Sequence, residues 1–338
     1  MSDLKHLNFN VSADECFSEL KPHPKFSSCT FDNYAHDTRY PSQLYLKNIL
    51  RSITEDSKNI EKKSFFSFLR NKKKNKTHDN LYIDGTYGVG KTHLLSACFN
   101  DFNGKKAFMS FLELTYFINF YGLENTIEKF KTLDLLLIDE FDLDDPATTR
   151  MAARLIDAVN QDTLIITTSN KLPKELGGGN FDTEMFAREL GIIANTFKTI
   201  VVEGVSFRIN LARWQANYSD KNFHDTMELK SKSEKILYVD FNELMEALRN
   251  NHPFRFFVIP KNYPSIFIEN FHTFQKLDDA LRFTTFIDHC YYHDTKLFIQ
   301  ALNISGDIFT TDMMETAFER RFLRCNSRLD EMAVFFKK

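Results

Sequence analysis

Short apolar runs alternate with helical patterns along most of this chain, and that rhythm restricts the folds open to it. Helical patterns begin at 91–99 and at 150–159. The runs that read as strands are 81–84, 107–111, 135–138, 164–167 and 199–202. Residues 135–138 are apolar throughout, as expected of a strand buried on both faces. Strand, helix and strand at this spacing predict an α/β fold with parallel strands joined by crossover helices.

The same rhythm continues beyond residue 204. Further strands are predicted at 236–240, 255–259, 266–268 and 296–299, and helices at 277–292 and 312–332. We therefore expect an additional C-terminal α/β portion after the first sheet.

Four parts of the chain follow from these patterns. Residues 1–54 form an N-terminal segment expected to pack on the core, and it contains a helix that starts near Pro41. Residues 55–80 are rich in lysine and read as an exposed linker. Residues 81–204 form the core, and residues 205–338 form the C-terminal portion.

Composition narrows the class of protein. Of the 338 residues, 43% are hydrophobic, which is enough for a sizeable core, and the formal net charge is −3. That charge argues against a protein that coats nucleic acid with its whole surface. The five cysteines form no CxxC pair. We expect reduced thiols and a cytoplasmic location.

A glycine-rich motif stands between the first predicted strand and the helix after it. It comprises Gly85, Thr86, Tyr87, Gly88, Val89, Gly90, Lys91 and Thr92 and matches G-x-x-x-x-G-K-[ST]. This placement is the context that a phosphate-binding P-loop requires, and it argues against a chance match. We predict that the loop binds ATP, that Lys91 reaches the β- and γ-phosphates, and that Thr92 binds Mg²⁺. No motif decides between ATP and GTP.

Two carboxylates end the apolar strand at 135–138. Asp139 is predicted at the carboxyl edge of a parallel sheet, where ligands bind, and there it would hold the Mg²⁺ ion. Glu140 is placed to orient or deprotonate an attacking water. Together with the P-loop, this pair predicts ATP hydrolysis.

Three further polar residues are candidates for the same site. Asn170 follows the next strand and is a candidate sensor of the γ-phosphate, although asparagine is equally common in turns. Arg188 lies on a predicted helix and is either an arginine finger offered to a neighbouring subunit or an ordinary surface arginine. Arg208 is a second candidate for a phosphate-facing arginine.

The sequence resembles the ZapE family of AAA+-type ATPases over nearly its whole length. The motifs that carry this resemblance are 22–26, 31–34, 41–43, 88–95, 138–146, 168–170, 176–179, 186–190, 204–208, 281–288 and 322–332. One departure is Ser206-Phe207-Arg208, where the family commonly has Asp-Tyr-Arg.

The resemblance implies a P-loop NTPase with an AAA+ or RecA-like parallel sheet that hydrolyses ATP and acts on other proteins. In bacteria the family is associated with the division ring at the inner membrane, and in mitochondria with membrane-protein quality control. A protein substrate or a division-ring component is therefore the expected partner. An arginine finger at Arg188 would require a homo-oligomer with head-to-tail contacts.

Two other functions remain open. One is an AAA+ helicase loader, since such proteins share this type of P-loop and a Thr-Ser-Asn sensor, although no nucleic-acid module is visible and nucleic acid is not the expected partner. The other is a nucleotide-gated scaffold at the inner face of the membrane. It would use the basic and aromatic segment 62–76 for peripheral contact, although a charge run is usually a solvated linker.

Overall fold

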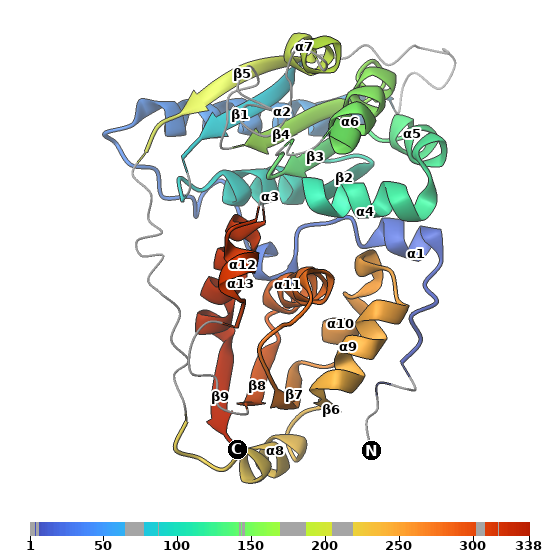
Figure 1. Ribbon diagram of the computed structural model, residues 1–338. Helices are drawn as coiled ribbons and strands as arrows, with labels where there is room; N and C mark the ends of the chain where they lie inside the picture. The colour runs from blue at the N-terminus through green and yellow to red at the C-terminus, as the bar shows by residue number, and fades with distance from the viewer. Residues whose placement is uncertain are drawn as a thin grey trace. The chain divides into compact units, whose positions relative to one another are not determined.

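The computed structural model describes residues 4, 7–64, 78–86, 88–141, 143, 146–169, 187–204, 219–301, 308–316 and 318–338. They divide into two compact units. The P-loop unit comprises Phe17–Pro22 and Phe26–Ile209. The C-terminal unit comprises Met1–Cys16, His23–Lys25 and Asn210–Lys338. Each unit contains its own parallel sheet (Figure 1).

The sheet of the P-loop unit has five parallel strands in the order β2-β3-β4-β1-β5. They are β1 (Asn80–Gly85), β2 (Lys106–Ser110), β3 (Leu135–Asp139), β4 (Leu164–Ser169) and β5 (Phe197–Val202). All five coincide with predicted strands to within a few residues. The register places Leu136 opposite Ile165 and Leu81 opposite Ile166, so the apolar centres of the strands align.

Helices cover both faces of this sheet. They are α2 (Pro41–Ser64), α3 (Lys91–Asp101), α4 (Phe111–Tyr121), α5 (Leu123–Lys131), α6 (Pro146–Val159) and α7 (Ala187–Thr196). Leu46 of α2 and Leu94 of α3 pack with Ile83 and Leu137 on one face. Because right-handed crossovers that run in the opposite direction along the sheet must use the other face, α4 to α7 lie there. The α/β P-loop fold predicted from the sequence is confirmed.

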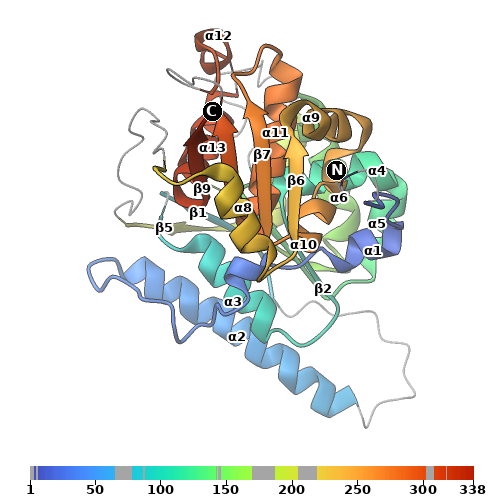
Figure 2. The same ribbon diagram turned by 90° about the horizontal axis from the view of Figure 1, so that it is seen from below.

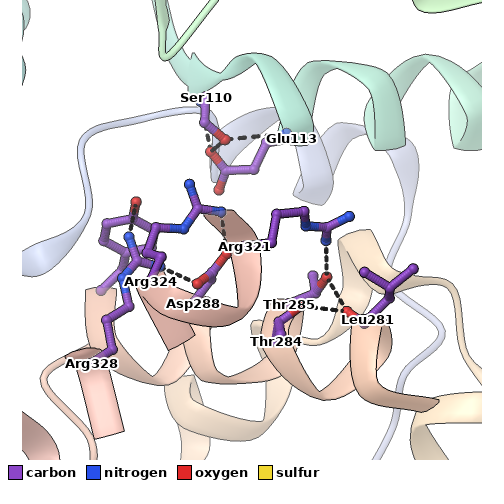
Figure 3. Close-up of polar contacts among 10 residues, drawn as sticks. Ser110, Glu113, Leu281, Thr284, Thr285, Asp288, Arg321, Arg324 and Arg328 are labelled. Carbon is purple, nitrogen blue, oxygen red and sulfur yellow. Dashed lines mark hydrogen bonds and ion pairs between the residues drawn. The ribbon is translucent and has the colours of Figure 1, made fainter. Parts of the chain in front are cut away.

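Local signals fix where α4 begins. Ser110 ends β2 and caps the helix, because its Oγ accepts the Glu113 N–H at 3.2 Å. The Glu113 carboxylate accepts the Ser110 N–H at 2.7 Å in return, as Figure 3 shows. This reciprocal capping box pairs two donors that a helix start otherwise leaves without partners.

The helix α2 continues to Ser64 and so enters the segment that composition marked as a linker. Its later turns are anchored on α3, beside which it lies in Figure 2. Thr54 donates to Asp101 at 2.7 Å, and Lys58 pairs with the same carboxylate at 2.5 Å. These contacts extend the helix into polar sequence, and residues 65–77, which hold most of the segment 62–76, lie outside the described residues.

The C-terminal unit has a four-stranded parallel sheet in the simple order β6-β7-β8-β9. The strands are β6 (Ile236–Asp240), β7 (Ser265–Phe271), β8 (Lys296–Ala301) and β9 (Ala333–Lys337). The helices are α8 (Phe223–Ser231), α9 (Phe241–Asn250), α10 (Val258–Asn262), α11 (Leu277–Tyr292), α12 (Thr311–Met314) and α13 (Glu319–Met332). Three further short elements lie among the described residues, namely α1 (Ala13–Ser18) and the 3-10 turns η2 (Pro24–Phe26) and η5 (Pro253–Arg255).

The two faces of this second sheet are covered unequally. Helices α9, α11 and α13 enclose the main core on one face, with Leu244, Phe283 and Phe322 fully buried. On the other face, Phe223 of α8 packs edge-on against Phe267 and Phe336, with ring centroids 5.5 and 5.4 Å apart.

Two predictions for this unit need correction, and one strand was not predicted. The apolar run 255–259 is helical rather than a strand, since Pro253 starts η5 and α10 follows. A short buried apolar run fits either structure, and periodicity alone cannot separate them. The single helix predicted at 312–332 is two helices, α12 and α13, and the strand β9 after it was not predicted.

A buried ion-pair cluster joins α11 to α13 (Figure 3). The Asp288 carboxylate accepts from Arg324 at 2.9 Å and from Arg328, and Arg328 also donates to the Tyr292 hydroxyl at 2.7 Å. Burial alone would raise the pKa of Asp288, but the charges of the nearby arginines outweigh it and hold the pKa below its usual value. Asp288 is therefore a stable buried carboxylate.

No helix among the described residues is both long enough and apolar enough to cross a bilayer.

Candidate active site

The site lies at the carboxyl edge of the first sheet, where β1, β3 and β4 end side by side. The helix α3 follows β1 to one face, whereas α6 follows β3 on the other face. This reversal is a topological switch point, where open parallel sheets bind ligands. It brings together the P-loop after β1 and the Asp139–Glu140 pair after β3, as the sequence predicted.

The P-loop turns tightly between β1 and α3. Gly88 and Gly90 have φ angles of 82° and 84°, in the region that glycine adopts without strain. A Cβ atom on Gly90 would lie 2.6 Å from the Tyr34 ring. Glycine is therefore required at position 90 both by the backbone conformation and by the close approach of Tyr34.

The Lys91 ammonium points back into the loop. It donates to the carbonyl oxygens of Gly85 at 2.5 Å and of Thr86 at 2.9 Å, and the residue is only 9% exposed. A buried cation held by neutral carbonyls retains most of its attraction for anions, because solvent does not screen it. The loop thus fits a phosphate group.

A hydrogen-bond network joins the P-loop to β3 and β4. Thr92 donates to Asp139 Oδ2 at 2.7 Å, and Thr168 donates to Asp139 Oδ1. The N–H of Glu140 donates to Thr168 Oγ1 at 3.1 Å. A hydroxyl and a carboxylate in contact are hard oxygen ligands of the kind that Mg²⁺ prefers.

Asp139 is buried next to a second carboxylate. Burial raises the pKa of Asp139 above its usual value, and the neighbouring Glu140 charge adds to the rise. The hydrogen bonds from Thr168 and Thr92, and the charge of Lys91, act in the opposite direction. Burial and the Glu140 charge thus disfavour the charged form of Asp139, and a bound cation would stabilise that form.

An N-terminal segment supports the loop from its outer side. The Tyr34 hydroxyl donates to the Val89 carbonyl at 2.8 Å, and burial raises the pKa of Tyr34 to about 12, so it stays protonated. On the side of β5, Thr86 donates to the Gly204 carbonyl at 3.0 Å, and Gln43 donates to the Glu203 carbonyl at 2.9 Å. These supports join parts of the chain far apart in sequence.

The remaining predicted site residues are placed less completely. Asn170, Arg208 and Tyr87 lie outside the described residues. Arg188 is exposed near the start of α7, and within the described part of the chain it makes no hydrogen bond or ion pair. The roles predicted for these four residues stay predictions.

Sequence reasoning did not assign roles to two residues that the structure brings into this site. In the sequence, Thr168 and Tyr34 belong only to the motifs 168–170 and 31–34 that carry the family resemblance. A threonine in an apolar strand carries no signal of its own, because its partners depend on which strands are neighbours.

Comparison with known proteins decides the family. A family model described as AFG1-like ATPase matches residues 12–227 and 215–336. The chain belongs to the AFG1-like ATPase family. It is accordingly an ATPase of the AAA+ type, and the family implies ATP and a divalent metal as its substrate and cofactor.

Other similarities of this AFG1-like ATPase are partial. The replication initiator DnaA of Lactococcus lactis subsp. lactis is 25% identical over 205 residues, which is 52% of this chain and 45% of DnaA. DnaA of Campylobacter curvus is 32% identical over 135 residues, or 36% of this chain and 30% of that protein. The chain thus spans less than half the length of either curated relative.

Two solved structures also resemble part of the chain. DnaI is 15% identical with a TM-score of 0.37, covering 53% of this chain and 93% of DnaI. The DnaC helicase loader is 14% identical with a TM-score of 0.36, covering 53% of this chain and 99% of DnaC. At these scores the fold assignment depends on the observed sheet and the family, not on these two structures.

Proposed function

We propose that this AFG1-like ATPase couples Mg²⁺-dependent ATP hydrolysis to the remodelling or regulation of a protein partner. The observation that carries the catalytic part is the contact between Thr92 and Asp139, which joins the P-loop to the carboxylate at the end of β3. The protein-directed part is supported by the resemblance to ZapE.

In this proposal Lys91 binds the β- and γ-phosphates in place of the carbonyls it now contacts. Thr92 and Asp139 hold the magnesium ion, which when bound neutralises charge on the phosphate oxygens. The residues fit these ligands chemically: the Lys91 ammonium attracts phosphate, and the Thr92 hydroxyl and Asp139 carboxylate are suitable ligands for a hard cation.

Glu140 would position the attacking water and accept its proton. It adjoins Asp139 but is only half-buried, so water can reach its carboxylate. Its φ angle of 53° is unusual for a residue other than glycine, and strain of this kind is concentrated at functional sites.

Arg188 would complete the site of a neighbouring subunit in a head-to-tail homo-oligomer. Arg188 is exposed, as this role requires, because the side chain of an arginine finger must extend from its own subunit to reach the site of a second copy. Asn170 as a sensor and Arg208 as a phosphate contact belong to the same proposal.

The partner is proposed to be a component of a division ring or a membrane protein under quality control. This choice depends on the resemblance to ZapE, and a cytoplasmic site of action, with peripheral contact at the inner face of the membrane, goes with it.

The test is phosphate release with ATP and Mg²⁺ over a series of protein concentrations, for the wild type, Lys91→Ala and Glu140→Gln. Turnover per molecule should rise with concentration and disappear in both variants. Lys106→Ala is a matched control, because Lys106 also donates to two carbonyls, of Phe99 at 2.5 Å and Phe102 at 2.6 Å, but at the far end of α3. It should retain turnover.

Unchanged hydrolysis by Glu140→Gln would show that Glu140 does not act on the attacking water as proposed. Tight ATP binding without turnover at any concentration would instead favour a nucleotide-gated scaffold, or an enzyme that requires its partner.

Action on nucleic acid is the second candidate, and the partial similarity to the replication initiator DnaA favours it. Its test is binding of a labelled single-stranded oligonucleotide at several salt concentrations, with and without residues 62–76. Affinity that falls steeply with salt and is lost on that deletion would support it.

A further inference from the structure

Thr168 is a buried hydroxyl at the centre of the site that the proposed chemistry does not use. It lies in β4, directly between the strands that carry the P-loop and Asp139, and is 1% exposed. Its hydroxyl donates to Asp139 Oδ1, while its oxygen accepts the Glu140 N–H at 3.1 Å. One hydroxyl therefore contacts both members of the carboxylate pair, and it acts as donor to one and acceptor to the other.

The backbone of Thr168 holds the next residue as well. Its carbonyl accepts the Phe141 N–H at 2.7 Å. Phe141 is fully buried and packs edge-on against Phe111, with ring centroids 4.8 Å apart. Residues 139, 140 and 141 are thus fixed in turn by a single residue of the neighbouring strand.

This fixation explains how Glu140 keeps its conformation. A positive φ angle in a residue other than glycine is strained, and it persists only where its surroundings determine it. The Glu140 N–H bond to Thr168 is one such constraint, and the Phe141 anchor is another. Without the hydroxyl, the Glu140 N–H loses this hydrogen bond, and the Asp139 carboxylate loses one of the two hydrogen bonds that the described side chains donate to it.

We propose that Thr168 is a positioning residue, which orients Asp139 toward the metal and Glu140 toward the attacking water. The inference rests on the roles proposed above for these two carboxylates. It assigns Thr168 no contact with ATP and no proton transfer.

The preceding residue provides a matched control. Thr167 is also fully buried in β4, but its side chain lies on the opposite face of the sheet because neighbours in a strand alternate. Thr167 Oγ1 has no hydrogen-bond partner among the residues that the structure describes. Replacing each threonine by valine keeps its shape and removes a buried hydroxyl. Among the described residues, only Thr168→Val thereby loses side-chain hydrogen bonds.

The experiment compares kcat, KM for ATP and the Mg²⁺ dependence of Thr168→Val, Thr168→Ser and Thr167→Val. In Thr168→Val we expect kcat to fall about 10- to 100-fold, the range seen when a group that orients a metal ligand is removed. KM for ATP should change little, and half-maximal activity should need more Mg²⁺. Thr168→Ser should restore most of kcat, and Thr167→Val should match the wild type.

Full kcat in Thr168→Val, or an equal loss in Thr167→Val, would overturn the inference. If the valine variant does not fold, the pair Thr168→Ser and Thr168→Ala repeats the comparison without the methyl group, and equal activity in both would also overturn it. Lys91→Ala and Glu140→Gln, measured beside these variants, separate the two proposals: if the wild type does not hydrolyse ATP, or if both variants hydrolyse it normally, the proposed function has failed. If both variants lose turnover while Thr168→Val keeps full kcat, only the role of Thr168 has failed.

Discussion

Two buried aspartates, one in each unit, show how the same residue type can serve opposite purposes. Asp139 and Asp288 are 7% and 8% exposed. The pKa of Asp139 is raised by burial and by Glu140, whereas burial at Asp288 is outweighed by arginines that lower its pKa. Burial costs both carboxylates hydration. Asp288 forms ion pairs with Arg324 and Arg328, whereas the hydrogen bonds that the described side chains donate to Asp139 come from the neutral hydroxyls of Thr92 and Thr168. Asp288 therefore stabilises its unit, while Asp139 is left with affinity for a cation from outside.

The topology of the two sheets places the aspartates in these different settings. In the P-loop unit the crossover connections reverse direction. The helix after β1 therefore lies on one face of the sheet, and the helices after β3 and β4 lie on the other face. In the C-terminal unit the order β6-β7-β8-β9 never reverses, so α9, α11 and α13 share one face. Asp288 lies between two of these helices, not at a strand end.

The largest expected effect concerns Asp288→Ala. Removing the carboxylate that Arg324 and Arg328 contact should lower the free energy of unfolding by about 3–5 kcal/mol. Urea unfolding followed by circular dichroism measures this. Asp279→Ala is the matched control on the same helix, since Asp279 pairs with Arg249, which is half exposed, at 2.8 Å. It should cost about 1 kcal/mol or less, and equal losses would contradict the contrast.

Acid should remove the contribution of Asp288. Because its pKa is lower in the folded than in the unfolded protein, the stability it provides is present above the unfolded value of about 4 and declines as pH falls through the folded value. The stability difference between wild type and Asp288→Asn should therefore shrink on acidification below about pH 4. A difference that grows with acid would show that the carboxylate is not held by the arginines.

Asp139→Asn should separate activity from stability. We expect turnover to fall on the order of 10²–10³-fold, as when one electrostatic contact to a reacting group is removed. Without metal, thermal stability should be equal to or above that of the wild type, because a neutral amide replaces a disfavoured buried charge beside Glu140. A clear loss of stability measured in a chelator would show that Asp139 is structural, like Asp288.

Tyr34→Phe tests the outer support of the P-loop. It removes the hydroxyl that donates to the Val89 carbonyl but keeps the ring that lies against Gly90. A loss of about 0.5–1.5 kcal/mol in unfolding free energy is expected, together with a modest rise in KM for ATP. An unchanged KM for ATP would show that the Tyr34 hydroxyl does not affect ATP binding and that Tyr34 contributes only to packing.

The smallest effect is expected for Leu229→Ser on α8. Leu229 is 69% exposed, and Leu229→Ser should change stability by less than about 0.5 kcal/mol. Phe223→Ala on the same helix should cost about 3 kcal/mol or more, since Phe223 is buried against Phe267. Thermal melts of both variants measure the contrast, and a large loss at Leu229 would indicate that this side chain is covered in solution.

Sequence periodicity predicted the first sheet well because its strands contain short apolar runs that are bounded by clear helical patterns. Residues 135–138 became β3 nearly unchanged. The same reasoning failed at 255–259, where five residues are too few to show a period and Pro253 starts a helical turn. It also overlooked β9, a strand of five residues at the end of a long helix.

The sequence by itself determined the P-loop, the carboxylates that follow β3 and the class of fold, because those features are local in the chain and their spacing is their signal. Only the tertiary structure decided that Thr168 contacts the Asp139 carboxylate and the Glu140 N–H, and that Tyr34 supports Val89. It also decided that Asp288 accepts from two arginines, whereas Asp139 accepts from two threonine hydroxyls. The reason is physical: hydrogen bonds and desolvation depend on which strands and helices become neighbours. The order of strands in a sheet cannot be predicted from any one segment of the sequence.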